Sequence, residues 1–150
     1  MAKTEAFGVS LRTVSWGRLF AVALAGTILQ VIANWILGGN PFSFGAVLVR
    51  HATQTAQNLA GAAGALVIGQ VYGLLYAVLF APVKLWGRLL RALIASLFID
   101  FLSILTMPGA AAVTWANAWP RGLEFLVFTL TLSFLYRNKQ TDGIVEGSLP

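Results

Sequence analysis

The chain has 150 residues, of which 58% are apolar and only 10% are charged, and its formal net charge is +5. Because soluble domains carry about 25% charged residues, this composition excludes a soluble globular protein and indicates one that is surrounded by lipid. The absence of cysteine and the single histidine exclude disulfides, thiolate chemistry and a zinc or bis-histidine haem site within one chain. The basic residues stand at the ends of apolar runs instead of massing together, so we expect no nucleic-acid partner.

Four segments are apolar and long enough to cross a bilayer, which takes about 20 residues in a helix. The first extends from about residue 19 to 38 and the second from about 59 to 81. The third extends from about 89 to 107 and the fourth from about 120 to 136, where Pro120 suits a first helical turn. The sequence therefore predicts an all-α integral membrane protein with one domain, 1–150, and four transmembrane helices in a bundle.

The segments outside these spans are predicted to be short helices or tails. Residues 1–17 have apolar residues at helical intervals, which predicts an amphipathic helix on the cytoplasmic face. The two outer loops, about 40–58 and 108–121, have patterns typical of short interfacial helices. Residues 137–150 are expected to form a cytoplasmic tail.

Lysine and arginine positions predict the orientation, because cytoplasmic segments of membrane proteins carry an excess of both. Eight of the ten lie on what would be one side of the membrane: Lys3, Arg12, Arg18, Lys84, Arg88, Arg91, Arg137 and Lys139. The other two, Arg50 and Arg121, fall in the outer loops. Both termini are thus predicted to be cytoplasmic, in a multi-pass protein of a bacterial or archaeal cytoplasmic membrane.

The second span has a small residue at every fourth position, which includes a GxxxG pair: Gly61, Ala65, Gly69, Gly73, Ala77 and Ala81. Such a face lets another helix approach closely in lipid. It would serve either to pack this chain's own bundle or to dock another subunit, a lipid or a flat pigment. The third span has a matching stripe of Ala92, Ser96, Asp100 and Ser103. Because the inner loop is short, we expect this stripe to pack on the small face in a tight hairpin.

An intramembrane polar cluster is predicted around Asp100, with the members Gln30, Gln70, Ser96, Asp100 and Ser103. With a rise of about 1.5 Å per residue, no lysine or arginine is expected at this depth. An ionised, unpaired carboxylate there costs about 2.5–3.5 kcal/mol, so we expect Asp100 to be protonated and hydrogen bonded to Gln70, Gln30 or a serine. Its role stays open between structural bonding, proton or ion binding, and a hydrogen bond to a bound lipid, quinone or pigment.

A second polar layer is expected nearer the outer surface, formed by Asn34, Arg50, His51, Arg121 and Glu124. Glu124 follows Arg121 by three residues, which favours an ion pair within one helix. His51 has the chemistry to bind the magnesium of a chlorophyll, but its place beside Arg50, outside the predicted hydrocarbon region, favours an ordinary interfacial histidine.

The sequence has no nucleophile–base arrangement, P-loop, dinucleotide-binding motif or HExxH motif. We therefore expect no enzymatic activity, no metal and no cofactor other than a bound lipid, quinone or pigment. The favoured interpretation is a small non-catalytic subunit of a larger respiratory, photosynthetic or transport complex. Its partners would be membrane lipids and other integral-membrane subunits or a second copy of itself. The alternatives are a small proton- or ion-coupled transporter that uses Asp100, and a lipid-, quinone- or pigment-binding membrane protein.

Overall fold

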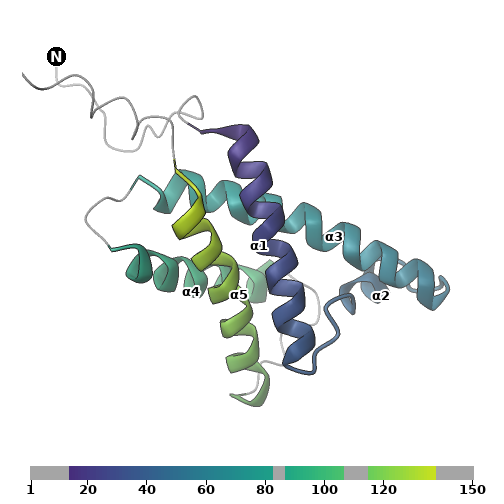
Figure 1. The fold of residues 1–150 in the computed structure, drawn as a ribbon. Helices are drawn as coiled ribbons and strands as arrows, with labels where there is room; N and C mark the ends of the chain where they lie inside the picture. Colours follow the sequence, from purple (N-terminus) through teal and green to yellow (C-terminus); the bar gives the residue numbers. More distant parts are fainter. Residues whose placement is uncertain (1–13, 83–86, 107–114, 138–150) are drawn as a thin grey trace, which may run out of the picture.

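The computed structural model describes residues 14–82, 87–106 and 115–137, and every regular element in these segments is a helix (Figure 1). Most of the expected N-terminal helix, the inner loop at 83–86, most of the second outer loop and the tail from 138 lie outside the described residues. The expected helix in the first outer loop is present as α2, Phe44–Leu48.

Four long helices account for most of the described residues. α1 is Trp16–Ile36, and α3 is Gln54–Leu75 and continues as a π-helix, η2, at Tyr76–Phe80. α4 is Arg88–Thr106 and α5 is Trp115–Leu135. Three of these helices, α1, α3 with η2, and α4, are long and apolar enough to cross a membrane. The chain therefore has the helices of a multi-pass membrane protein.

α5 begins earlier than the expected fourth span. Because it starts at Trp115, Pro120 lies inside the helix and not in its first turn. Proline has no N–H, so the carbonyl four residues earlier loses its helical hydrogen bond. Pro120, Arg121 and Glu124 also lower the mean hydropathy of this half of α5, which is not among the three helices apolar enough to span by length and composition.

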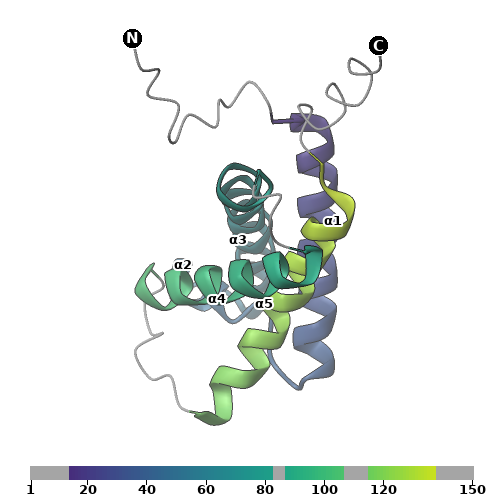
Figure 2. The ribbon, with the colours of Figure 1, turned by 90° about the vertical axis from the view of Figure 1, so that its left-hand side faces the viewer.

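The long helices pack in the order α3, α1, α5, α4. α1 and α5 lie side by side in opposite directions, whereas α3 crosses α1 steeply, as Figures 1 and 2 show from two sides. At one end of the α1–α5 pair, Arg18 Nε donates a hydrogen bond to the carbonyl of Leu135 at 3.0 Å. The expected packing of the second and third spans as a hairpin is wrong, because α4 packs on α5 and on η2 and not along α3.

The small residues of α3 explain where α3 crosses α1. A Cβ atom at Gly73 would lie 2.7 Å from the Cβ of Ala23, and one at Gly69 would overlap Thr27 Oγ1. Further along, Gly61 lies against the backbone of Phe42 in the loop before α2. Much of the small-residue face is therefore occupied by this chain's own α1 and first outer loop.

The other small residues of this face lie in the core or beside a cleft, and the stripe lies on α4. Ala77 is fully buried, Ala81 packs against the core and Ala65 lines a cleft. The stripe on α4 faces α5, where Thr129 Oγ1 donates a hydrogen bond to the carbonyl of Ala92 at 2.8 Å. Ser133 Oγ also donates a hydrogen bond to the carbonyl of Arg88 at 2.7 Å. The short inner loop led us to expect a hairpin, but these two hydrogen bonds hold the stripe face of α4 against α5.

The core lies where α1, η2, α4 and α5 meet, and its largest fully buried side chains include Tyr76, Ile99 and Phe128. Large apolar side chains also cover the outer surface of every long helix, among them Phe20 and Leu97, which are 60% and 62% exposed. Such exposure is costly in water and favourable in hydrocarbon, so the outer surface is suited to contact with lipid.

Candidate functional site

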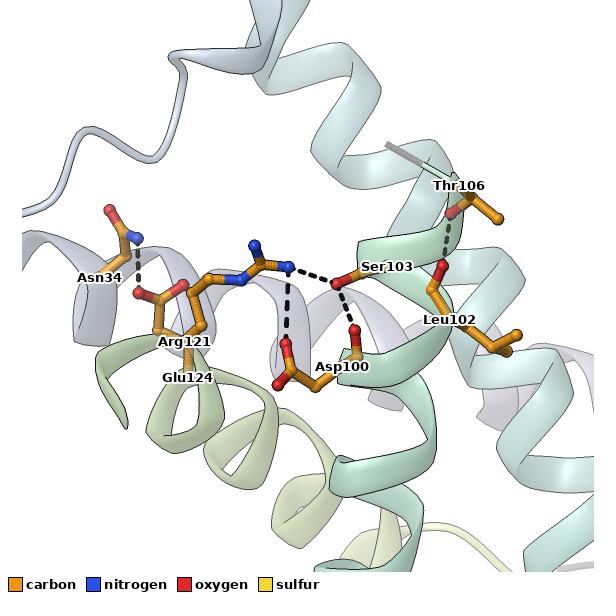
Figure 3. Close-up of polar contacts among 7 residues, drawn as sticks. All are labelled: Asn34, Asp100, Leu102, Ser103, Thr106, Arg121 and Glu124. Carbon is orange, nitrogen blue, oxygen red and sulfur yellow. Dashed lines mark hydrogen bonds and ion pairs between the residues drawn. The ribbon is translucent and has the colours of Figure 1, made fainter. Parts of the chain in front are cut away.

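Polar side chains from three helices meet near the end of the α1–α5 pair opposite Arg18. α5 contributes Arg121 and Glu124, which are one helical turn apart, α4 contributes Asp100 and Ser103, and α1 contributes Asn34. Figure 3 shows the Arg121 side chain reaching from α5 towards α4, with Asn34 and Glu124 on its other side. We refer to these five residues as the polar junction.

The α4 side of the polar junction is held by Arg121. Its Nη2 donates a hydrogen bond to Ser103 Oγ at 2.6 Å and lies 3.5 Å from Asp100 Oδ1 (Figure 3). Ser103 Oγ donates in turn to the backbone carbonyl of Asp100 at 2.8 Å. Asp100 Oδ1 itself is buried and accepts no hydrogen bond. The guanidinium therefore lies beside the Asp100 carboxyl group without closing a bidentate ion pair.

The α1 side of the polar junction is a short hydrogen bond between Asn34 and Glu124. Asn34 Nδ2 donates to Glu124 Oε1 at 2.6 Å, and Glu124 is only 8% exposed. The amide oxygen of Asn34, Oδ1, is buried without a hydrogen-bond partner. This side therefore has a buried carboxylate with one donor and, beside it, an acceptor with none.

The expectation that no basic group lies at the depth of Asp100 is wrong, because Arg121 reaches it. That expectation assigned Arg121 to the second outer loop, whereas α5 begins at Trp115 and carries Arg121 inside the helix. The expected ion pair between Arg121 and Glu124 is also replaced. Among the described residues, the ion pair of Arg121 is with Asp100, and the hydrogen bond of Glu124 is with Asn34.

Three other members of the predicted inner cluster lie apart from the Asp100 carboxylate. Gln70 Nε2 donates to the carbonyl of Phe20 on α1 at 3.4 Å. Ser96 Oγ donates to the carbonyl of Leu93 in its own helix at 2.8 Å. Gln30 lines a cleft beside Asn34. Of the predicted inner cluster, only Ser103 joins Asp100 in the polar junction.

Two members of the predicted outer layer also lie elsewhere. Arg50 and His51 are exposed in the turn between α2 and α3, and neither lines the cleft. The contact of Arg50 is through its backbone carbonyl, which accepts a hydrogen bond from Gln57 Nε2 at 3.5 Å. His51 therefore lies outside the polar junction and outside the cleft beside it.

The polar junction borders a cleft of about 490 Å³ between α1, α3 and α5, closed at one side by the loop before α2. Its polar lining includes Gln30, Asn34, Ser103, Arg121 and Glu124. Its apolar lining includes Val31, Val47, Ile68, Tyr72 and Phe125, and the small residues Gly61, Ala65 and Gly69 complete it. Volumes of this size are typical of small-molecule sites, which combine an apolar wall with a few polar groups.

Sequence reasoning missed the aromatic wall of this cleft. Tyr72 and Phe125 meet edge to face, with ring centroids 6.0 Å apart and ring planes at 73°. Both side chains are less than 9% exposed. Tyr72 adjoins Gly73 and follows Gly69 by three residues, so its position next to the small-residue face was the available signal.

Two carboxylates, a guanidinium, amides and a hydroxyl supply charge and hydrogen bonds, and no group of three metal-ligating side chains occurs among the described residues. A scan of protein-family models finds no match to the chain, and comparisons with curated proteins and with solved structures find none either.

Proposed function

We propose that this chain is a small non-catalytic subunit of a larger membrane complex of the respiratory, photosynthetic or transport kind. The observation that supports the proposal is the limited contact between the two outer helices of the row, α3 and α4. α3 packs along α1 and α4 packs along α5, and α4 meets the α3 helix at its η2 end, where Phe80 and Phe98 are in contact. Along the rest of their lengths α3 and α4 do not pack along each other, as neighbouring helices of a closed four-helix bundle do.

The exposed surfaces agree with this open arrangement. In the most apolar 18-residue stretch, only 28% of α1, 33% of α3 with η2, and 28% of α4 is buried within the chain. The outer face of α4 carries large apolar side chains at every fourth position, including Leu93, Leu97 and Phe101. Lipid covers such faces adequately, but two end helices with open sides also offer room for neighbouring subunits without disrupting the chain's own packing.

The proposed subunit has four spans with both termini in the cytoplasm of a bacterial or archaeal cell. The basic residues at one end of the molecule support this orientation. At that end, Arg18 near the start of α1 lies beside Leu135 near the end of α5. At the same end, the guanidinium of Arg88 lies 5.7 Å from the centre of the Phe134 ring, so α4 begins there too. Basic residues at one end are the pattern of a cytoplasmic face. α5 runs alongside α1 from Glu124, which is hydrogen bonded to Asn34, to Leu135, which is hydrogen bonded to Arg18, and we assign it as the fourth span.

A mild detergent extraction from the native membrane, followed by native mass measurement, tests the subunit proposal. We expect a mass larger than that of the chain or its homodimer, with at least one other integral-membrane protein. Photo-crosslinkers placed at Leu97 on α4 and at Val67 on α3 should label that partner, whereas one placed at the buried Phe128 should not. A monodisperse monomer or homodimer whose crosslinkers at both positions capture only lipid would refute the proposal.

A second candidate function is a proton- or ion-coupled transporter, which the geometry around Asp100 favours. The loose contact of 3.5 Å between Asp100 and Arg121 lies next to a cleft, and helix irregularities flank the site at Pro120 and η2. Irregular helices and intramembrane carboxylates are typical of transport sites. In proteoliposomes with an internal pH dye, Asp100→Asn should abolish proton flux if this function holds. Equal flux in wild type, Asp100→Asn and empty liposomes would exclude it.

A further inference from the structure

The cleft beside the polar junction is lined by a carboxylate, Glu124, that can accept further hydrogen bonds. Glu124 receives one hydrogen bond, at Oε1, and no second one from the part of the chain that the structure describes. Buried acceptors are normally paired, and each one left unpaired costs about 1–3 kcal/mol. A bound molecule that completes this site would therefore supply donors.

The charges around the cleft point in the same direction. Glu124 and Arg121 on α5 line the cleft, and Asp100 on α4, which does not line it, lies 3.5 Å from Nη2 of Arg121. With all three ionised, the polar junction carries one net negative charge. An uncompensated charge at membrane depth is expensive, so a bound cation would lower the electrostatic free energy of the site.

The apolar wall completes the chemical description. Tyr72 and Phe125, whose rings are in edge-to-face contact, line the cleft together with the aliphatic side chain of Ile68. Aromatic rings attract cations within about 6 Å of their centres and also pack against an apolar body. The volume of about 490 Å³ is large enough for a small organic molecule and not merely for a proton or a water.

We propose that this cleft binds a small amphipathic organic cation, whose ammonium N–H groups face Glu124 and whose apolar body lies against Tyr72 and Phe125. The site is independent of the proposed subunit role, because it uses the inner faces of the helices and not the open outer faces of α3 and α4. An anion would fit poorly. Nη2 of Arg121 already contacts Ser103 and Asp100, and a ligand anion would lie next to the Glu124 carboxylate.

Three probes that share one ring and differ in charge test this proposal: benzylammonium, benzyl alcohol and benzoate. Their binding is measured by isothermal titration calorimetry near neutral pH, with the full chain in nanodiscs of zwitterionic phosphatidylcholine and with empty nanodiscs as the reference. We expect benzylammonium to bind more tightly than benzyl alcohol, and benzoate to give no saturable heat. This ranking uses the unmodified chain, so it does not depend on whether any variant folds.

Variants then locate the site. Glu124→Gln preserves the side-chain shape and a hydrogen-bond acceptor for Asn34, and it should weaken benzylammonium binding more than about tenfold by removing the charge partner. Ser96→Ala is the control, because Ser96 bonds within its own helix away from the cleft, and its affinity should match that of wild type. Circular dichroism and size-exclusion elution confirm that both variants are folded.

Two results would overturn the proposal. Benzoate binding more tightly than benzylammonium would show that Arg121 controls the site and that the ligand is an anion. No saturable heat with any probe, or a folded Glu124→Gln variant with wild-type affinity for benzylammonium, would show that the cleft is not a cation site.

Discussion

The contact between Gly73 and Ala23 predicts that one added methyl group will separate α3 from α1. In Gly73→Ala, the new Cβ would lie 2.7 Å from the Cβ of Ala23, whereas ordinary carbon contacts are about 3.5–4.0 Å. Both atoms are fixed by their backbones, so no side-chain rotation relieves the overlap, and the helices must move apart by roughly 1 Å. Overpacking of this kind costs about 1–3 kcal/mol. The helix propensity of alanine offsets at most about 1 kcal/mol of that loss.

Gly122→Ala is the matched control for this prediction. Gly122 is also inside a long helix, but a Cβ there would have no atom within 4 Å. The substitution therefore adds the higher helix propensity of alanine without any steric overlap. We expect Gly122→Ala to be neutral or stabilising by up to about 1 kcal/mol. Unfolding of both variants and wild type is followed by circular dichroism in mixed micelles with increasing denaturing detergent. If Gly73→Ala and Gly122→Ala have the same midpoint, the close approach of α3 and α1 is refuted.

Other contacts give further predictions. Thr129→Val removes the hydrogen bond from Thr129 to the Ala92 carbonyl between α4 and α5 and should destabilise the chain by about 0.6–1.7 kcal/mol in the same denaturation assay. Thr131→Val, whose hydroxyl bonds only within α5, should cost less, and an equal loss would contradict the assignment. Asn34→Leu leaves the Glu124 carboxylate without its donor and should cost about 1–3 kcal/mol. Glu124→Gln should then rescue part of this loss in the double variant, and strict additivity of the two changes would refute the coupling. Gly69→Leu overlaps Thr27 and should destabilise the isolated chain; a fully stable isolated variant that loses a co-purifying partner would instead assign this face to an intermolecular contact.

The helical class and three of the long apolar helices could be predicted from sequence because both follow from local composition. A segment such as Arg88–Thr106 is apolar over enough residues to cross a bilayer, and lipid leaves the backbone few alternatives to a helix. The order in which helices pack is not local. The stripe from Ala92 to Ser103 could have faced α3 or α5, and only the position of Thr129, Ser133 and Arg121 on α5 decides between them.

For the candidate site too, sequence predicted the polar residues but not the contacts between them. Sequence reasoning assigned Asn34, Asp100, Ser103, Arg121 and Glu124 to two polar layers at different depths. The structure joins these five because α5 starts before Pro120 and because the arginine side chain is long enough to reach the next helix. Estimates from residue rise alone place Cα atoms, and they do not include this reach. Gln70 was misplaced for a related reason, since the steep crossing of α3 turns it towards Phe20 on α1.

Pro120 links the architecture to the chemistry of the polar junction. The proline removes one backbone hydrogen bond in the first half of α5, one residue before Arg121 and four before Glu124. The two charged side chains therefore project from the part of the helix whose backbone ladder is weakest. Their partners lie on different helices, Ser103 and Asp100 on α4 and Asn34 on α1. A small shift of this end of α5 would thus change both contacts together, and a ligand beside Glu124 would act on a segment that contacts both α1 and α4.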